Sequence, residues 1–406
     1  MATTRIDVKS PRLILLIMIA ASGASILSTD LYAPTLPHLP AYFGTDSTTV
    51  QLTMALNMAA YAFSQLLWGP LSDWYGRRAI FVYGMAAFAL TVIAAAVSQT
   101  IGQLIVARIL MGTAASVEAV IVLAVIGDLY GGKESAKVFA LYGMVVSLVP
   151  AAGPILGGFI FEWFGWRANF VVLAGVVAAV FAVGLLRLPE TLPAAERTAL
   201  KLGAIVSGYA QLLMRGGFVT VAMTLGLALG AIFAYITEAP FILIDKHGIA
   251  TRYFGLYQAF IVLAFFIGSF ISGQIVDRIG VRRLFAIGVW SGSLSGLLVI
   301  VAVSFGETPV TLTATMSVFG FALGPLFASA PVLAFERVTD HGRGMSAAML
   351  STFEMGGGAL GALFVSLTPD GTAWPLAICV SGAAALLLVV GLLALRLKWA
   401  APSTNA

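Results

Sequence analysis

Five charged side chains lie within apolar stretches of this sequence, and their types suit proton chemistry. They are Asp30, Arg108, Glu118, Glu238 and Glu354. A charged side chain near the centre of a bilayer costs about 2.5–3.5 kcal/mol on insertion scales, so each is a candidate functional residue. A buried carboxyl group whose charged neighbour comes and goes can bind and release a proton near neutral pH. We therefore predict that this set couples proton movement to function.

Asp30 is the leading candidate for the coupling acid. The three histidines, His38, His247 and His341, lie outside the predicted membrane spans, so carboxyl groups must carry any side-chain proton relay. A helix rises about 1.5 Å per residue, which places Asp30 and Arg108 at similar depth toward the outer surface. We expect these two side chains to form a direct pair. The alternative is a static buried ion pair that only fixes helix packing.

The other three acids each have two interpretations. Glu238 is followed by a proline, as Asp30 is, although the spacing differs. It is either a second proton-binding or cation-binding acid or a solvated carboxylate at a helix end. Glu118 and Glu354 lie deeper, where a carboxylate facing lipid would be costly. We expect both to face a central cavity and to attract cationic or polar substrate groups or exchange protons; the alternative is a structural pairing with Tyr or Asn.

Polar and aromatic side chains on otherwise apolar helices are the candidates for a substrate cavity. Asn57, Tyr61 and Gln65 recur every four residues and so share one face of a helix. Aromatic walls with few hydrogen-bonding groups suit lipophilic, drug-like molecules. For each single member, ordinary helix packing is the alternative. The predicted substrate-binding residues are Tyr32, Asn57, Tyr61, Gln65, Tyr142, Tyr235, Tyr257, Gln258 and Phe353.

The elements that position these residues must cross a membrane. The chain has 406 residues, of which 60% are hydrophobic and 10% charged, whereas a soluble domain carries about 25% charged residues. That composition excludes an ordinary soluble enzyme. A spanning helix needs about 20 apolar residues, because backbone amides cannot stay unpaired in hydrocarbon. Twelve spans are predicted: 12–34, 49–69, 79–98, 101–126, 136–160, 168–187, 215–243, 252–275, 283–303, 309–334, 343–366 and 373–395.

Lys and Arg are distributed as expected for these spans. Short loops rich in Lys and Arg stay cytoplasmic during membrane insertion. Of the 22 Lys and Arg residues, only Arg167, Lys246 and Arg252 fall on the far side of the membrane from the N-terminus, and Arg108 lies within a span. Both termini are therefore predicted to be cytoplasmic. The net charge of +4 reflects this asymmetry, and no basic patch indicates a nucleic-acid partner.

The sequence lacks the patterns of hydrolytic, redox or metal chemistry. Its single cysteine, Cys379, lies in the last predicted span, which excludes an internal disulfide and argues against a cysteine metal site. It has no phosphate-binding Gly-x-x-x-x-Gly-Lys-Ser/Thr loop and no Ser/His/Asp grouping suited to a membrane setting. We predict that the protein is not an enzyme, holds no metal or cofactor, and draws its energy from an ion gradient, not from ATP.

A polar segment near the middle of the chain divides the predicted spans into two sets of six. It covers residues 188–214 and contains Glu190, Glu196, Arg197 and Lys201. We predict an N-terminal six-helix bundle over 1–187, a cytoplasmic linker over 188–214, and a C-terminal six-helix bundle with a short cytoplasmic tail over 215–406. The equal numbers of spans indicate that the two halves derive from one duplicated unit.

One motif occurs in both halves at matching positions. A Gly, an Asp four residues later, a Gly and basic residues follow the second and the eighth predicted spans, 204 residues apart (273 minus 69). Glycines permit tight turns, and the Asp can accept from a helix N-terminus or an Arg of the bundle. Such a cluster can hold one conformation; the alternative is a turn with basic membrane anchors. Its residues are Gly69, Asp73, Gly76, Arg77 and Arg78, echoed by Gly273, Asp277, Gly280, Arg282 and Arg283.

These residues resemble the signature of the major facilitator superfamily between helices 2 and 3, with its weaker echo between helices 8 and 9. Arg108 in helix 4 and a segment of helix 5 with Gly153, Pro154, Gly157 and Gly158 are similar to two further motifs of that family. The helix-5 segment resembles the antiporter motif, which in the family implies export. Residues 29–37 are similar to the bicyclomycin-resistance and chloramphenicol/florfenicol-efflux (Bcr/CflA-like) branch.

The resemblance implies an all-α membrane fold of two six-helix bundles related by pseudo-twofold symmetry. It also implies a multi-pass protein of the bacterial inner (cytoplasmic) membrane that exports small lipophilic, drug-like compounds or antibiotics in exchange for protons, by alternating access. In that family the helix-1 acid and the helix-4 arginine have coupling roles, which fall here on Asp30 and Arg108.

Two expectations stay open beside this resemblance. The alternative function is proton-coupled export of a small metabolite such as a sugar or amino acid, and we expect a monomer.

Helix 11, the predicted span 343–366, departs from the family pattern, because its glycines, Gly356, Gly357, Gly358 and Gly361, come without a Gly-Pro pair. The antiporter motif is therefore not duplicated there, and close helix packing is enough to explain those glycines.

Overall fold

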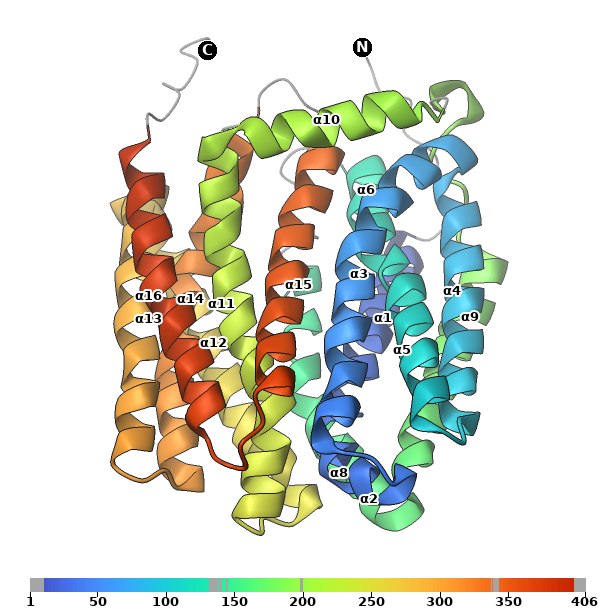
Figure 1. Cartoon of the computed structure of the whole chain (residues 1–406). Helices are drawn as coiled ribbons and strands as arrows, with labels where there is room; N and C mark the ends of the chain where they lie inside the picture. Colours follow the sequence, from blue (N-terminus) through green and yellow to red (C-terminus); the bar gives the residue numbers. More distant parts are fainter. Residues whose placement is uncertain are drawn as a thin grey trace. The chain divides into compact units, whose positions relative to one another are not determined.

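The computed structural model describes residues 11–130, 138, 141–143, 145–197, 200–336, 338 and 343–397, and these form helices and turns without a strand. Helices suit the apolar composition, because a helix satisfies its backbone hydrogen bonds within one segment. The helices of the first half (Figure 1) are α1 (Pro11–Asp30), η1 (Ala33–His38), α2 (Leu39–Phe43), α3 (Ser47–Tyr75), α4 (Arg77–Val97), α5 (Ile101–Ala115), α6 (Val117–Leu129), α8 (Val149–Phe164) and α9 (Trp166–Arg187). Those that follow are η2 (Ala194–Glu196), α10 (Leu202–Met214), α11 (Gly216–Pro240), η3 (Phe241–Lys246), α12 (Thr251–Ile279), α13 (Val281–Ser304), α14 (Pro309–Glu336), α15 (Arg343–Leu367) and α16 (Trp374–Arg396).

Helices occupy the predicted membrane spans. Ten stretches of the described chain are long and apolar enough to cross a bilayer, with α5 and α6 joined into one of them. α3, with 29 residues, covers the predicted span 49–69 but carries more polar side chains and is not among the ten. α8, with 16 residues, covers the second part of the predicted span 136–160; in the first part, residues 136, 137, 139, 140 and 144 lie outside the described residues. The protein is therefore an all-α, multi-pass membrane protein.

Local signals set where several helices begin. Asp46 caps α3 by accepting a hydrogen bond from the backbone N–H of Thr49 at 2.6 Å, and this bond lowers the pKa of Asp46. A lowered pKa means that the cap is complete above the ordinary pKa of an aspartate and is lost as the pH falls through the lowered value. Thr100 and Gln103 form a capping box at the start of α5.

The chain divides into two compact units. The first comprises Met1–Lys201 together with Thr237–Ala259, and the second comprises Leu202–Ile236 and Phe260–Ala406. The end of α11, η3 and the start of α12 therefore belong with the helices of the N-terminal half. The boundary after Lys201 falls within the segment 188–214, which contains η2 and α10.

Glycines permit close helix contacts within each unit. In the first unit, a Cβ at Gly112 of α5 would overlap the backbone of Asn57 in α3. In the second unit, Gly357 of α15 lies against the backbone of Gly226 in α11. Small residues are the usual means by which membrane helices approach one another. The packing explanation for the glycines of the eleventh predicted span, 343–366, is thus confirmed at Gly357.

The internal repeat has a geometric counterpart. Arg78, at the start of α4, donates from Nη2 to the carbonyl of Leu185 in α9 at 2.8 Å. Arg282, at the start of α13, donates from Nη2 to the carbonyl of Leu395 in α16 at 2.8 Å. Figure 1 shows α4 beside α9, and α13 beside α16. An arginine of the repeated motif therefore joins the same pair of helices in each unit.

Candidate functional site

Arg108 of α5 is fully buried and forms no ion pair with a carboxylate of the described chain. Its Nη1 donates to the carbonyl of Ser28 in α1 at 2.7 Å, and its Nη2 lies 3.3 Å from the sulfur of Met54 in α3. The guanidinium is 4.6 Å from the ring centre of Tyr32, within the range of a cation–π contact. The expected direct pair with Asp30 is therefore wrong for this conformation, because a backbone carbonyl and an aromatic face occupy the guanidinium.

Asp30 ends α1 and is 3% exposed. Gln258 of α12 lies beside it, but neither Oδ2 of Asp30 nor the carboxamide of Gln258 completes a hydrogen bond with a described residue. α8 packs directly on this point of α1, since a Cβ at Gly153 would overlap the side chain of Asp30 and a Cβ at Gly157 would overlap the backbone of Leu31. One glycine of the antiporter-like segment, Gly153, thus touches the leading candidate acid, and Gly157 touches the residue after it.

The same segment of α8 also packs on the start of α12. Gly158 lies against the backbone of Thr251, and Gly255 lies against the backbone of Pro154. Only glycine leaves room for backbones to come this close. α8 therefore contacts both α1 and α12 and sets how closely the two helices approach.

Glu118 of α6 lies in a cluster of hydroxyl groups. Ser22 of α1 donates to its Oε2, and Tyr61 of α3 donates to its Oε1 at 3.2 Å. Tyr142 shares a hydrogen bond of 2.6 Å with Ser22. Glu118 is 4% exposed and forms no ion pair with a described residue. The contact with Tyr61 is the pairing named in the structural alternative, and the absence of a basic neighbour in the described chain also suits a cation-binding or proton-exchanging acid.

The two acids of later helices lie in different units. Glu238, near the end of α11, is 3% exposed, so it is not the solvated carboxylate of the alternative. Nε2 of Gln51 in α3 donates to its Oε2 at 2.7 Å. Glu354 lies midway along α15 and is half-buried. The structure therefore places four of the five charged candidates in the first unit and Glu354 in the second.

Several predicted substrate residues pack between helices. The hydroxyl of Tyr32 shares a hydrogen bond of 2.8 Å with Thr53. Asn57 donates to the carbonyl of Arg108 at 2.7 Å, and Gln65, two turns further along α3, is 1% exposed. These contacts hold α3 against η1 and α5, so the shared face of α3 is in part a packing face.

The remaining predicted substrate residues have other surroundings. Tyr61 and Tyr142 belong to the cluster around Glu118. Tyr235 is 2% exposed in α11. Tyr257 and Phe353 are half-buried, in α12 and α15.

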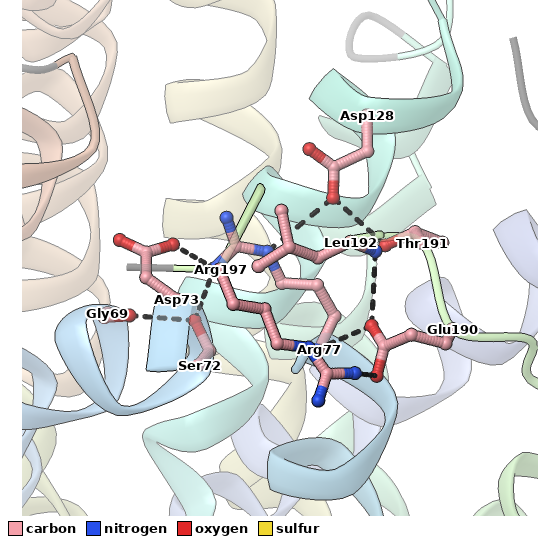
Figure 2. A network of polar contacts seen from close by, with 9 residues as sticks. All are labelled: Gly69, Ser72, Asp73, Arg77, Asp128, Glu190, Thr191, Leu192 and Arg197. Atoms are coloured by element: carbon pink, nitrogen blue, oxygen red, sulfur yellow. Dashed lines mark hydrogen bonds and ion pairs between the residues drawn. The ribbon is translucent and has the colours of Figure 1, made fainter. Parts of the chain in front are cut away.

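The conformational motif lies in a polar network at the turn from α3 to α4, shown in Figure 2. Asp73 pairs with Nη1 of Arg77 at 2.5 Å, and Nε of Arg77 lies 3.5 Å from Oδ2 of Asp128 at the end of α6. Thr191 donates to the same oxygen of Asp128 at 2.9 Å. The backbone N–H of Arg77 donates to Oε1 of Glu190 at 2.9 Å. The network therefore joins α3, α4, α6 and the segment after α9.

Gly76 is the point where that segment meets the motif. Its φ of 104° is rare for residues with a side chain, and a Cβ there would overlap Glu190 and Arg197. Arg197 pairs with Glu190 at 3.3 Å, as Figure 2 shows. The start of the predicted linker is thus fixed on the turn from α3 to α4 and is not a free tether.

The second copy of the motif has fewer contacts. Gly280 keeps a positive φ of 83° at the turn from α12 to α13. Arg282 binds the end of α16, but Asp277 and Arg283 form no ion pair with a described residue. The repeat therefore preserves the turn and one arginine contact within the described chain.

Some residues that complete these clusters were not indicated by the sequence patterns. The spacing of the internal repeat could have indicated Gln51. It precedes the predicted residue Gln258 by 207 residues (258 minus 51), close to the spacing of the repeated motif. No comparable signal marks a serine or threonine, because single hydroxyl residues are common in apolar helices. The residues missed as site members are Ser22, Gln51, Glu190, Thr191 and Arg197.

Comparison with known proteins agrees with this architecture. The family model described as Major Facilitator Superfamily matches residues 17–362 and 238–406. A chloramphenicol resistance protein of Pseudomonas aeruginosa is 29% identical over 87% of this chain and 83% of its own length. The multidrug transporter MdfA of Edwardsiella piscicida is 29% identical over 74% of this chain and 73% of its own.

A solved structure shows the same fold. The crystal structure of a D-xylose–proton symporter superposes with a TM-score of 0.72, over 95% of this chain and 97% of its own, at 15% identity. At that identity the likeness concerns the fold alone. With helices at its predicted spans, a repeated Gly–Asp–Arg turn and a family match over most of its length, the chain belongs to the Major Facilitator Superfamily.

Proposed function

We propose that this protein is a proton-coupled exporter of small, drug-like compounds, antibiotics among them. Its relatives named as a chloramphenicol resistance protein and a multidrug transporter support this class of substrate. The coupling part of this proposal rests on Asp30, a buried carboxyl group in contact with Gly153 of α8 and next to Gln258. An acid kept from water is costly in its charged form, so it suits a step that binds a proton.

Arg108 is the proposed alternating partner of Asp30. It already binds α1 through the carbonyl of Ser28, two residues before Asp30. A small rotation of α1 would exchange that carbonyl for the carboxylate, and a charge-assisted hydrogen bond is roughly twice as strong as a neutral one. In this proposal Asp30 pairs with Arg108 when deprotonated and separates from it when protonated.

The cluster around Glu118 is the proposed contact for polar or cationic groups of the substrate. Its carboxylate is held by hydroxyl groups and has no basic partner in the described chain. Tyr61 and Tyr142 add aromatic surface beside it. In the second unit, Glu354 with Phe353 and Tyr235 is proposed for the same role on α15 and α11.

The proposed setting is the bacterial inner membrane, with both termini in the cytoplasm and a monomer as the working unit. The distribution of Lys and Arg supports this orientation. Two six-helix bundles, over 1–187 and 215–406, would be joined by the segment 188–214. A membrane potential supplies about 2.3 kcal/mol per charge per 100 mV, so a proton gradient meets the energy need without a cofactor.

Replacing Asp30 by asparagine tests the coupling role. Everted vesicles containing the full chain would be energised by a pH gradient and supplied with radiolabelled chloramphenicol or a fluorescent lipophilic cation. We expect Asp30→Asn to lower uphill accumulation at least tenfold, about 1.4 kcal/mol, because an amide cannot exchange a proton. Yield and membrane insertion should remain normal.

A matched control is Asp46→Asn, because asparagine also caps helices and Asp46 is exposed. It should transport like the unaltered protein. Undiminished uphill accumulation by Asp30→Asn would remove Asp30 from the coupling role. Competition by sugars or amino acids, with no drug transported, would favour the metabolite exporter instead.

A further inference from the structure

Two buried acids, at the ends of α1 and α11, each meet a glutamine from another helix. Glu238 of α11 accepts a hydrogen bond from Nε2 of Gln51 in α3 at 2.7 Å. Asp30 of α1 lies beside Gln258 of α12, whose carboxamide completes no hydrogen bond with a described residue. All four side chains are 1–3% exposed and belong to the same unit. Water therefore competes little for either contact.

The internal repeat relates the two pairs. Glu238 follows Asp30 by 208 residues (238 minus 30), and Gln258 follows Gln51 by 207 (258 minus 51). The repeated Gly–Asp turn has a spacing of 204 (273 minus 69). Acid thus corresponds to acid and glutamine to glutamine. Each acid lies beside the glutamine of the other repeat. A chance arrangement would have to produce this neighbourhood twice.

A carboxamide distinguishes a carboxylate from a protonated carboxyl group. A carboxylate only accepts, so glutamine can offer it an N–H; a protonated carboxyl group also donates, and the glutamine carbonyl can accept that bond. Oε1 of Gln51 has no partner among the described residues, and neither do Oε1 and Nε2 of Gln258 or Oδ2 of Asp30. Buried polar atoms are rarely left without partners. The unused acceptors are therefore placed to receive carboxyl protons.

We propose that Asp30 with Gln258, and Glu238 with Gln51, form a duplicated acid–amide clasp that closes α1 on α12 and α11 on α3 when the acids are protonated. The clasp rests on the proposed proton coupling and gives the two glutamines positioning roles. Each closure adds one bond, from the carboxyl O–H to the glutamine Oε1, and the proton comes from water. A proton that reaches these acids from outside the cell would thus favour the conformation in which this end of the bundle is closed. An exporter must reach that conformation after it releases its substrate outside.

α8 provides the close fit that the clasp requires. Gly153 touches Asp30, and Gly255 of α12 lies against the backbone of α8. Other titratable groups on the packed elements must be considered in any pH response. They include Arg108 on α5, Tyr32 before η1, His38 on η1, Tyr61 on α3, Glu162 on α8, Arg252, Tyr253 and Tyr257 on α12, and Asp245 and Lys246 on η3.

A distance measurement tests the clasp without requiring transport. Spin labels at exposed positions 41 and 253 (Ala41→Cys, Tyr253→Cys, with Cys379→Ser) would report the separation of α2 and α12 in nanodiscs. We expect the short-distance fraction to rise as the pH falls. Combined Gln51→Leu and Gln258→Leu should abolish that rise. The matched control Gln211→Leu, on exposed α10, should keep it.

Reciprocal exchange makes the test specific to the contact. Asp30→Asn with Gln258→Glu moves the carboxyl group to α12 and the amide to α1, and it should restore a pH response that Asp30→Asn alone weakens. If the leucine variants do not fold, Gln258→Glu alone should shift the response midpoint upward by about one pH unit or more, because two adjacent carboxyl groups share a proton. An unchanged midpoint, or an unchanged response in the double leucine variant, would overturn the clasp.

The clasp and the export proposal fail in different ways. A protein that transports no drug but keeps the pH-dependent distance, with loss of it in the leucine variants, would contradict export alone. Proton-driven efflux with a distance independent of pH would contradict the clasp alone.

Discussion

At the scale of single residues, Arg108 and Glu118 are buried charged groups of the first unit that form no ion pair with a described residue. The guanidinium of Arg108 donates to a backbone carbonyl and lies over the ring of Tyr32. The carboxylate of Glu118 accepts hydrogen bonds from the hydroxyl groups of Ser22 and Tyr61. Neutral partners bind a charge less strongly than an opposite charge does. Both charged groups are therefore able to bind a partner that arrives during the transport cycle.

Replacing Glu118 by glutamine separates a charge role from a packing role. The amide keeps hydrogen-bonding capacity toward Ser22 and Tyr61 but removes the negative charge. We expect the affinity for a lipophilic cation such as ethidium to fall at least tenfold, about 1.4 kcal/mol, with a smaller change for neutral chloramphenicol. Fluorescence and calorimetric binding to the purified protein would measure this. Equal losses for both compounds would assign Glu118 to packing, and Glu336→Gln, on an exposed acid, is the control.

At the scale of elements, the Gly/Pro segment of α8 sets the spacing of its neighbours. Gly153 and Gly157 allow the end of α1 to pack closely on α8, and Gly158 allows the start of α12 to do so. Larger side chains at these points would push the helices apart, and Asp30 of α1 would no longer lie beside Gln258 of α12. The antiporter-like motif therefore has a direct physical link to the proposed coupling acid.

Gly157→Val tests that link. Valine would overlap the backbone of Leu31, and overpacking of this kind costs roughly 1–3 kcal/mol. We expect a lower melting temperature in detergent and loss of uphill transport. Gly175→Val on α9, where a Cβ would meet nothing within 4 Å, should change neither. Normal transport by Gly157→Val would show that close contact of α1 and α8 is not required.

At the scale of the whole molecule, the segment after α9 is part of the conformational network. Glu190 binds the start of α4, and Thr191 binds the end of α6. The segment that connects the two halves of the chain is therefore fixed to the motif that the family resemblance associates with conformational change. Partly exposed ion pairs contribute only about 0–1 kcal/mol to stability, so we expect the network to act mainly on rates.

Asp73→Asn and Glu190→Gln should therefore slow transport more than they lower stability. We expect counterflow rates to fall about tenfold, roughly 1.4 kcal/mol in activation free energy, with melting temperatures close to that of the unaltered protein. Stopped-flow counterflow in proteoliposomes would measure the rates. Asp370→Asn, in the exposed turn after α15, serves as the control. Counterflow at the normal rate in Asp73→Asn would contradict a latch at this turn.

The helical spans, the acids within them and the repeated turn were predictable from the sequence. The length of an apolar run and the placement of Lys and Arg are local properties that the bilayer itself selects. The positions of Asp30, Glu118 and Glu354 within predicted spans follow directly from those runs. The repeated turn was equally visible, because its glycines and charges keep their spacing along the chain.

The partners of those residues were decided only by the tertiary structure. Arg108 binds a carbonyl and not Asp30, Gln51 meets Glu238, and Glu190 reaches Arg77 from the segment after α9. The direction in which a side chain points depends on how its helix is rotated against its neighbours. That rotation is set by glycine contacts and side-chain packing among residues far apart in the chain, which no local pattern encodes.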